Sequence, residues 1–135
     1  MTTKRILVVD DQDSVREVVQ LCFEDLAGWK VLTACSGYEG LALAAVEKPD
    51  AIVLDVMMPG MDGITFLQHL KAEPTTQFIP VVLLTAQFEL TQPKYIEHLD
   101  VVGVISKPFD PFSLADSVAE ALGWTTGVKV KEGKQ

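Results

Sequence analysis

Five polar residues of this 135-residue chain share one feature, because each follows closely on a short run of apolar residues. They are Asp10, Asp11, Asp55, Thr85 and Lys107. Carboxylates, a hydroxyl and an ammonium together can hold a hard cation and a phosphoryl group. Asp13 and Asp62 have a simpler explanation as a helix cap or turn residue, since a single Asp beside a turn commonly accepts backbone N–H groups.

Three carboxylates in one place would repel one another, and burying their charge without a cation is costly. Mg²⁺, or Mn²⁺ in its place, would relieve the repulsion, since it takes oxygen ligands and keeps several waters. A carboxylate beside such a cation can attack phosphorus, because the metal screens the repulsion between two anions. Lys107 and Thr85 can then bind the phosphoryl oxygens. Each residue type alone has an ordinary explanation, so the prediction rests on their joint placement.

The apolar runs before these residues predict the strands of a buried parallel sheet. They occupy residues 6–9, 51–54, 81–84 and 101–105, and residues 29–34 are a fifth candidate. Continuous runs rich in β-branched residues are typical of strands buried on both faces. Ligands bind outside the carboxyl ends of the strands in such a sheet. The five polar residues are therefore expected to meet at one edge.

Segments with helical spacing alternate with the predicted strands. They span about 14–26, 37–47, 64–72 and 111–122, with Ser36 and Asp110 as expected caps and Gly123 as a stop. Residues 87–99 have the length of a helix but contain Pro93, so a late start or a distorted helix is expected. The alternation predicts an α/β domain over residues 1–123, with helices on both faces of the sheet. Residues 124–135 are expected to form a basic, flexible tail.

Composition narrows the classes of function. Asp and Glu number 19 against 11 for Lys and Arg, a net charge of −8, which argues against direct nucleic-acid binding and suits protein or cation partners. No stretch approaches the ~20 apolar residues of a membrane span, so we expect no membrane contact and a cytoplasmic location. Cys22 and Cys35 lack the spacing of metal ligands and are expected to be free thiols.

Four blocks of the sequence, ILVVDDQDSVRE, IVLDVMMPGMDG, VVLLTA and VISKPFDP, resemble the signature blocks of response-regulator receiver domains. The resemblance covers about residues 5–122. It implies a CheY-like, flavodoxin-like fold: a doubly wound, five-stranded parallel sheet of order 2-1-3-4-5 with five helices. It also implies a single-domain switch in two-component phosphorelay signalling. Such a switch promotes only its own phosphorylation and dephosphorylation, so we do not expect an enzyme with separate substrates.

The same resemblance assigns roles to the acidic residues. Asp55 would accept a phosphoryl group from the phosphohistidine of a histidine kinase or from a phosphotransfer protein. Asp11, Asp55 and the backbone carbonyl of Met57 would bind Mg²⁺ directly, and Asp10 would act through water. The output partner is expected to bind a surface built from residues 87–99, the last strand and the last helix, on a chain that is a monomer or a weak homodimer.

Further roles follow for the residues near the ends of the last two strands. By resemblance, Thr85 would move to the phosphoryl group, Lys107 would pair with it, and the Lys107–Pro108 bond would be cis. The family's usual switch aromatic stands three residues before the lysine, where this chain has Val104. Because Val104 has no ring to swing, we expect any switch to use the loop after Thr85 and residues 87–99 instead.

Three residues are expected to tune the lifetime of the acyl phosphate. Met57 stands two residues after Asp55, and Gln87 stands two residues after Thr85, so both would flank the approach of water. Met57 cannot orient water and Gln87 is a poor base, which predicts slow self-dephosphorylation. Ala86 is small and should leave the site open.

Two other classes of function use similar chemistry. A Mg-dependent phosphatase with an aspartyl nucleophile of the haloacid-dehalogenase type would need a second Asp where Met57 stands. Activity on a generic phosphoester with true turnover would favour this alternative. A nucleotide-binding module would need a glycine-rich phosphate loop after the first strand, where Asp10 and Asp11 stand instead.

Overall fold

Five parallel strands form one sheet in the order β2-β1-β3-β4-β5, which confirms the predicted flavodoxin-like topology. The computed structural model describes residues 3–86, 94, 97 and 99–124. The strands are β1 (Arg5–Val9), β2 (Lys30–Ala34), β3 (Ala51–Asp55), β4 (Val81–Thr85) and β5 (Gly103–Ser106). Every residue of β3 and β4 is buried, as their continuous apolar sequences predict.

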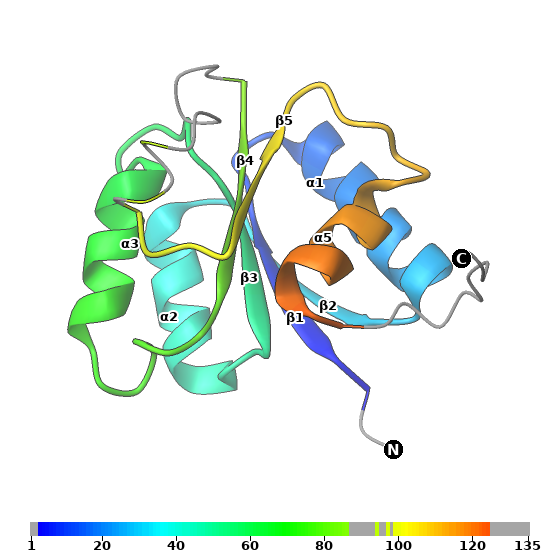
Figure 1. Ribbon diagram of the computed structural model, residues 1–135. Helices are drawn as coiled ribbons and strands as arrows, with labels where there is room; N and C mark the ends of the chain where they lie inside the picture. The colour runs from blue at the N-terminus through cyan, green and yellow to red at the C-terminus, as the bar shows by residue number, and fades with distance from the viewer. Residues whose placement is uncertain (1–2, 87–93, 95–96, 98, 125–135) are drawn as a thin grey trace.

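Helices cover both faces of this sheet (Figure 1). α2 (Gly37–Glu47) and α3 (Gly63–Ala72) lie on one face, and α1 (Asp13–Leu21) and α5 (Leu114–Leu122) lie on the other. α1 continues into a π-helical turn, η1 (Cys22–Leu26). Most of the expected fourth helix, at 87–99, and almost all of the expected tail, at 124–135, lie outside the described residues. In the part of the chain that the structure describes, no helix is long and apolar enough to cross a membrane.

Several helix ends follow the sequence signals, but the starts of α1 and α5 do not. α1 begins at Asp13, and its N-cap, Gln12, makes no side-chain capping bond, so the expected cap role of Asp13 is wrong. Ser36 accepts a hydrogen bond from the Glu39 N–H at 3.1 Å, and Gly123 ends α5 in the left-handed conformation. The last helix starts at Leu114 and not at residues 111 or 112. Asp110 does accept a hydrogen bond from Phe112 N–H, but this bond closes a turn before the helix instead of capping it.

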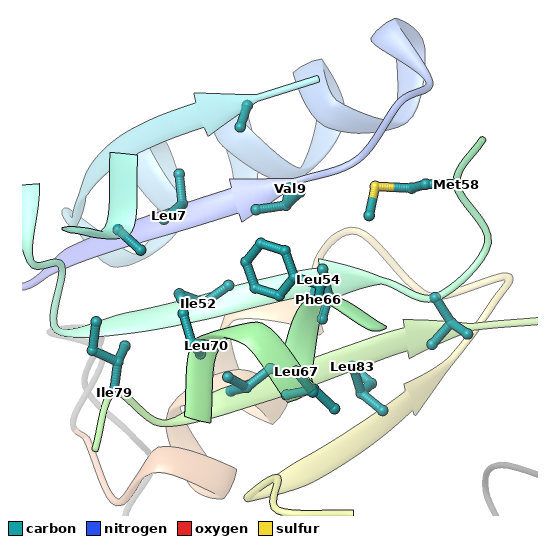
Figure 2. Close-up of a cluster of buried hydrophobic side chains, with 14 of the residues drawn as sticks. Leu7, Val9, Ile52, Leu54, Met58, Phe66, Leu67, Leu70, Ile79 and Leu83 are labelled. Carbon is teal, nitrogen blue, oxygen red and sulfur yellow. The ribbon is translucent and has the colours of Figure 1, made fainter. Parts of the chain in front are cut away.

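Two separate cores fix the sheet between its helix layers. Figure 2 shows the core under α2 and α3, where Phe66 lies among side chains of β1, β3 and β4. The second core lies under α1 and α5, where the Trp29 ring lies 5.1 Å from the rings of both Phe23 and Trp124. Burial on both faces fixes the register of each strand, and therefore the level at which each strand ends.

Gly63 begins α3 directly against the end of β3. A Cβ atom at Gly63 would lie 2.8 Å from Val56 Cα and 3.2 Å from the Asp55 carbonyl oxygen. The Gly63 N–H donates to the Val56 carbonyl at 2.8 Å, and Asp62 caps the helix by accepting from Thr65 N–H. The expectation of a turn or cap role for Asp62 is thus confirmed. Glycine lets the backbone of α3 approach the strand end that carries Asp55.

We therefore predict that Gly63→Ala lowers the free energy of unfolding by about 1–3 kcal/mol, because the added methyl group meets backbone that cannot move aside. Gly37→Ala is the comparison, since Gly37 is also the first residue of a helix but its added Cβ would meet side-chain atoms of Met61, at 2.9 to 3.1 Å, and not backbone. Urea unfolding of both variants measures the difference. Equal losses would show that crowding against β3 is not what requires glycine.

Candidate functional site

The carboxyl ends of four strands bring the predicted polar residues to one edge of the sheet. Asp10, Asp11 and Asp55 each offer a carboxylate oxygen, and these oxygens lie within 4.8 Å of one another. Lys107 Nζ lies 3.1 Å from Asp55 Oδ1 and 3.5 Å from Asp10 Oδ2. Thr85 is buried at the end of β4, opposite Ser106 in the register of β5. All five residues chosen from the sequence therefore converge.

Burial makes this cluster electrostatically strained. Asp10 is fully buried, Asp55 is 4% exposed, and a single ammonium, Lys107, contacts the cluster in the described part of the chain. Burial, and secondly the charge of Asp10, raise the pKa of Asp55, which the hydrogen bond from Lys107 only partly offsets. Among the described residues, Asp10 Oδ2 is the buried side-chain oxygen that accepts no hydrogen bond. The site is therefore short of positive charge.

A hard divalent cation fits this deficit. The three carboxylates have oxygens within reach of one ion. Asp10 and Asp55 are buried and Asp11 is half-buried. Together they form the oxygen-rich donor set that Mg²⁺ or Mn²⁺ prefers. The Asp10 oxygen without a hydrogen bond would gain a partner, either directly or through a water of the ion. The cluster could thus hold a metal at the end of β1 and β3.

Hydrogen bonds from backbone N–H groups hold the loops that carry these side chains. The Gln12 N–H donates to Asp10 Oδ1 at 2.9 Å, and the Met57 N–H donates to Asp55 Oδ1 at 3.4 Å. The Lys107 N–H donates to the Thr85 carbonyl at 2.8 Å, and the Lys107–Pro108 bond is cis, as expected. Each loop is therefore fixed by bonds made within it or to its neighbour.

A solvent-open cavity of about 200 Å³ gives access to Asp55. It is lined by Gln12, Asp55, Met57, Ala86 and Lys107. Met57 and Ala86 are exposed, and their role in tuning the lifetime of the acyl phosphate stays a prediction. Gln12 was not singled out from the sequence, although its position directly after two acids at a strand end was the available signal. Gln87 lies outside the described residues.

Val104 occupies the position of the expected switch residue. It lies in β5 opposite Leu83 and packs, partly buried, against the core under α2 and α3. A valine in this position has no ring that could turn between the core and the surface. The alternative switch segment, residues 87–99, falls mostly outside the described residues, so it stays a prediction.

Comparison with known proteins gives one consistent family. The response regulator receiver domain model matches residues 6–119. The chain is 52% identical over 84 residues to response regulator PleD of Caulobacter vibrioides, which covers 61% of this chain and 18% of PleD. It is 33% identical over 122 residues to sporulation initiation phosphotransferase F of Bacillus subtilis, which covers 90% of this chain and 96% of that protein.

Solved structures agree with the sequence matches. Chemotaxis response regulator CheY4 of Vibrio cholerae superimposes with a TM-score of 0.80 at 32% identity, covering 89% of this chain and 99% of CheY4. The chain thus spans a small part of PleD but nearly the full length of CheY4 and of phosphotransferase F. Receiver domains interact with histidine kinases or phosphotransfer proteins in two-component signalling. This chain belongs to the family of response regulator receiver domains.

Proposed function

We propose that Asp55 accepts a phosphoryl group, in a Mg²⁺-dependent reaction, from the phosphohistidine of a histidine kinase or phosphotransfer protein. The observation that carries this proposal is the surroundings of Asp55. Its carboxylate lines an open cavity, lies 3.1 Å from Lys107 Nζ, and shares its cluster with two further carboxylates. Phosphoryl transfer needs a nucleophile and positive charge close to it. Asp55 can be that nucleophile, and Lys107 and a cation bound by the carboxylates can supply the charge.

The chain's own residues divide the work. A carboxylate oxygen of Asp55 forms a bond to phosphorus while the P–N bond of the phosphohistidine breaks, and the imidazole leaves with that electron pair. Lys107 and the Thr85 hydroxyl bind phosphoryl oxygens, and the ammonium of Lys107 offsets the negative charge that the phosphoryl group brings. Asp10, Asp11, Asp55 and the Met57 carbonyl would hold Mg²⁺. The bound metal supplies electrostatic screening between the two anions.

The phosphorylated domain would signal by changing protein contacts. We assign the output surface to β5, α5 and residues 87–99, because β5 carries Ser106 opposite Thr85 and leads directly into Lys107. The net charge of −8 makes a protein partner better suited than nucleic acid. Cytoplasmic histidine kinase domains would be the donors.

A phosphatase with true turnover has less support. Such an enzyme would need a proton donor beside the cavity, close to the leaving oxygen of its substrate. In the haloacid-dehalogenase type that donor is an Asp two residues after the nucleophile, where this cavity has the exposed apolar side chain of Met57. The geometry therefore favours a phosphoryl group that stays on Asp55 over one that is rapidly released.

Incubation with acetyl phosphate and Mg²⁺ tests the acceptor directly. We expect intact-mass spectrometry to show the gain of one phosphoryl group on the wild type, and none on Asp55→Asn, which lacks the nucleophilic oxygen. Asp62→Asn is the matched control, because Asp62 lies in the loop after β3 and an Asn still caps α3. Labelling of Asp55→Asn, or loss of labelling in Asp62→Asn alone, would contradict the assignment.

The lifetime of the acyl phosphate should depend on residue 57. We predict that Met57→Asn speeds loss of the phosphoryl group several-fold, because an amide at the cavity rim can orient the attacking water. Met57→Leu should behave like the wild type, since it keeps an apolar side chain of similar size. Single-turnover decay after removal of the donor gives both rates. If the phosphoryl group decays as slowly on Met57→Asn as on Met57→Leu, the side chain at position 57 does not orient the attacking water.

A further inference from the structure

Arg16 makes two contacts with its guanidinium one turn into α1. One guanidinium nitrogen donates to the backbone carbonyl of Asp10 at 2.7 Å. The other pairs with the Asp13 carboxylate. The Arg16 side chain is only 17% exposed, although Asp13 is 79% exposed. The guanidinium is therefore partly buried against the loop that carries Asp10 and Asp11.

These contacts fasten the backbone of Asp10, and with it the peptide group that leads into Asp11. The Arg16 backbone N–H also donates to the Gln12 carbonyl at 2.9 Å, so both the backbone and the side chain of Arg16 bind the loop after β1. On the other side of the same residue, the Asp10 N–H donates to the Ala34 carbonyl at 3.1 Å, which ties Asp10 to the end of β2. Asp10 is thus held at its N–H by β2 and at its carbonyl by Arg16.

Arg16 contributes positive charge without occupying the carboxylates. In the described part of the chain Arg16 forms an ion pair with Asp13, whereas Lys107 contacts Asp10 and Asp55 directly. An arginine suits this place because its planar fork holds a carbonyl and a carboxylate at the same time, which a lysine ammonium does less well. Arg16 thus leaves the carboxylate oxygens of the cluster to Lys107 and a cation.

We propose that Arg16 is a positioning residue of the cation site, which fixes the loop of Asp10 and Asp11 so that both carboxylates stand ready before the metal arrives. The inference rests on the proposed Mg²⁺-dependent function. If the loop were free, ordering it would oppose metal binding, and affinity would fall. The large contribution should come from the partly buried bond to the Asp10 carbonyl, since the pair with exposed Asp13 is open to solvent.

The chain offers a matched control at the opposite end of β1. Arg5 also donates to a backbone carbonyl and a carboxylate, those of Glu47, at 2.7 and 2.8 Å. It ties β1 to the end of α2, far along the strand from the acidic cluster. Loss of Arg5 therefore removes the same kind of interaction from the fold but leaves the loop of Asp10 untouched.

The experiment measures Mn²⁺ affinity by electron paramagnetic resonance, with the free energy of unfolding measured separately in EDTA. We expect Arg16→Met to bind Mn²⁺ about tenfold more weakly than the wild type, as found for residues that orient metal ligands. Arg5→Met should bind Mn²⁺ as the wild type does, whatever it loses in stability. Arg16→Lys should recover part of the affinity, and Asp13→Asn should weaken it less than Arg16→Met.

The outcomes separate this inference from the proposed function. If the wild type binds Mn²⁺ and Arg16→Met binds it equally well, the positioning role is wrong while the cation site stands. Equal weakening by Arg5→Met would mean that the effect is one of general stability, which also overturns the role. If the wild type itself binds no Mn²⁺, the cation site fails and this inference fails with it. If Arg16→Met does not fold, Arg16→Lys decides: it should bind Mn²⁺ more weakly than both the wild type and Arg5→Met, and affinity equal to the wild type would overturn the role.

Discussion

The rest of the site depends on the repulsion among three carboxylates held at one edge of a sheet. Lys107 lies within 3.5 Å of two of them, and burial denies Asp10 and Asp55 the solvation that would make their charges stable. A folded protein keeps such an arrangement only where something compensates for it. A divalent cation, and then a phosphoryl group whose charge meets Lys107, would supply that compensation in turn.

The fold maintains this repulsion by leaving the strand ends no freedom to relax. Cores on both sides fix the register that sets Asp55 opposite Leu84 and Thr85 opposite Ser106. Gly63 brings α3 against the backbone after Asp55, and Arg16 holds the loop after β1 by its hydrogen bond to the Asp10 carbonyl. Stability elsewhere in the domain thus offsets the cost of a strained site, which is common where a site is preorganised for binding.

Much of this could be predicted from the sequence, because it follows from local patterns. Continuous apolar runs gave the strands, and the polar residue after each run gave the site, since parallel strands end at one edge. The start of the last helix was missed because Asp110 can cap a helix or close a turn, and only packing decides between them. Gln12 and Arg16 were missed because their roles depend on contacts with loop backbone, which residue type alone does not reveal.

The most direct test compares the free energy of unfolding in EDTA and in excess Mg²⁺ at constant ionic strength. At a Mg²⁺ concentration a hundred times its dissociation constant, binding should stabilise the wild type by about 2.7 kcal/mol. Asp55→Asn should be the more stable protein in EDTA, because it lacks one buried charge, and should gain much less from Mg²⁺. A wild type equally stable in both solutions, or an Asp55→Asn variant that gains as much, would contradict the claim that a cation compensates this cluster.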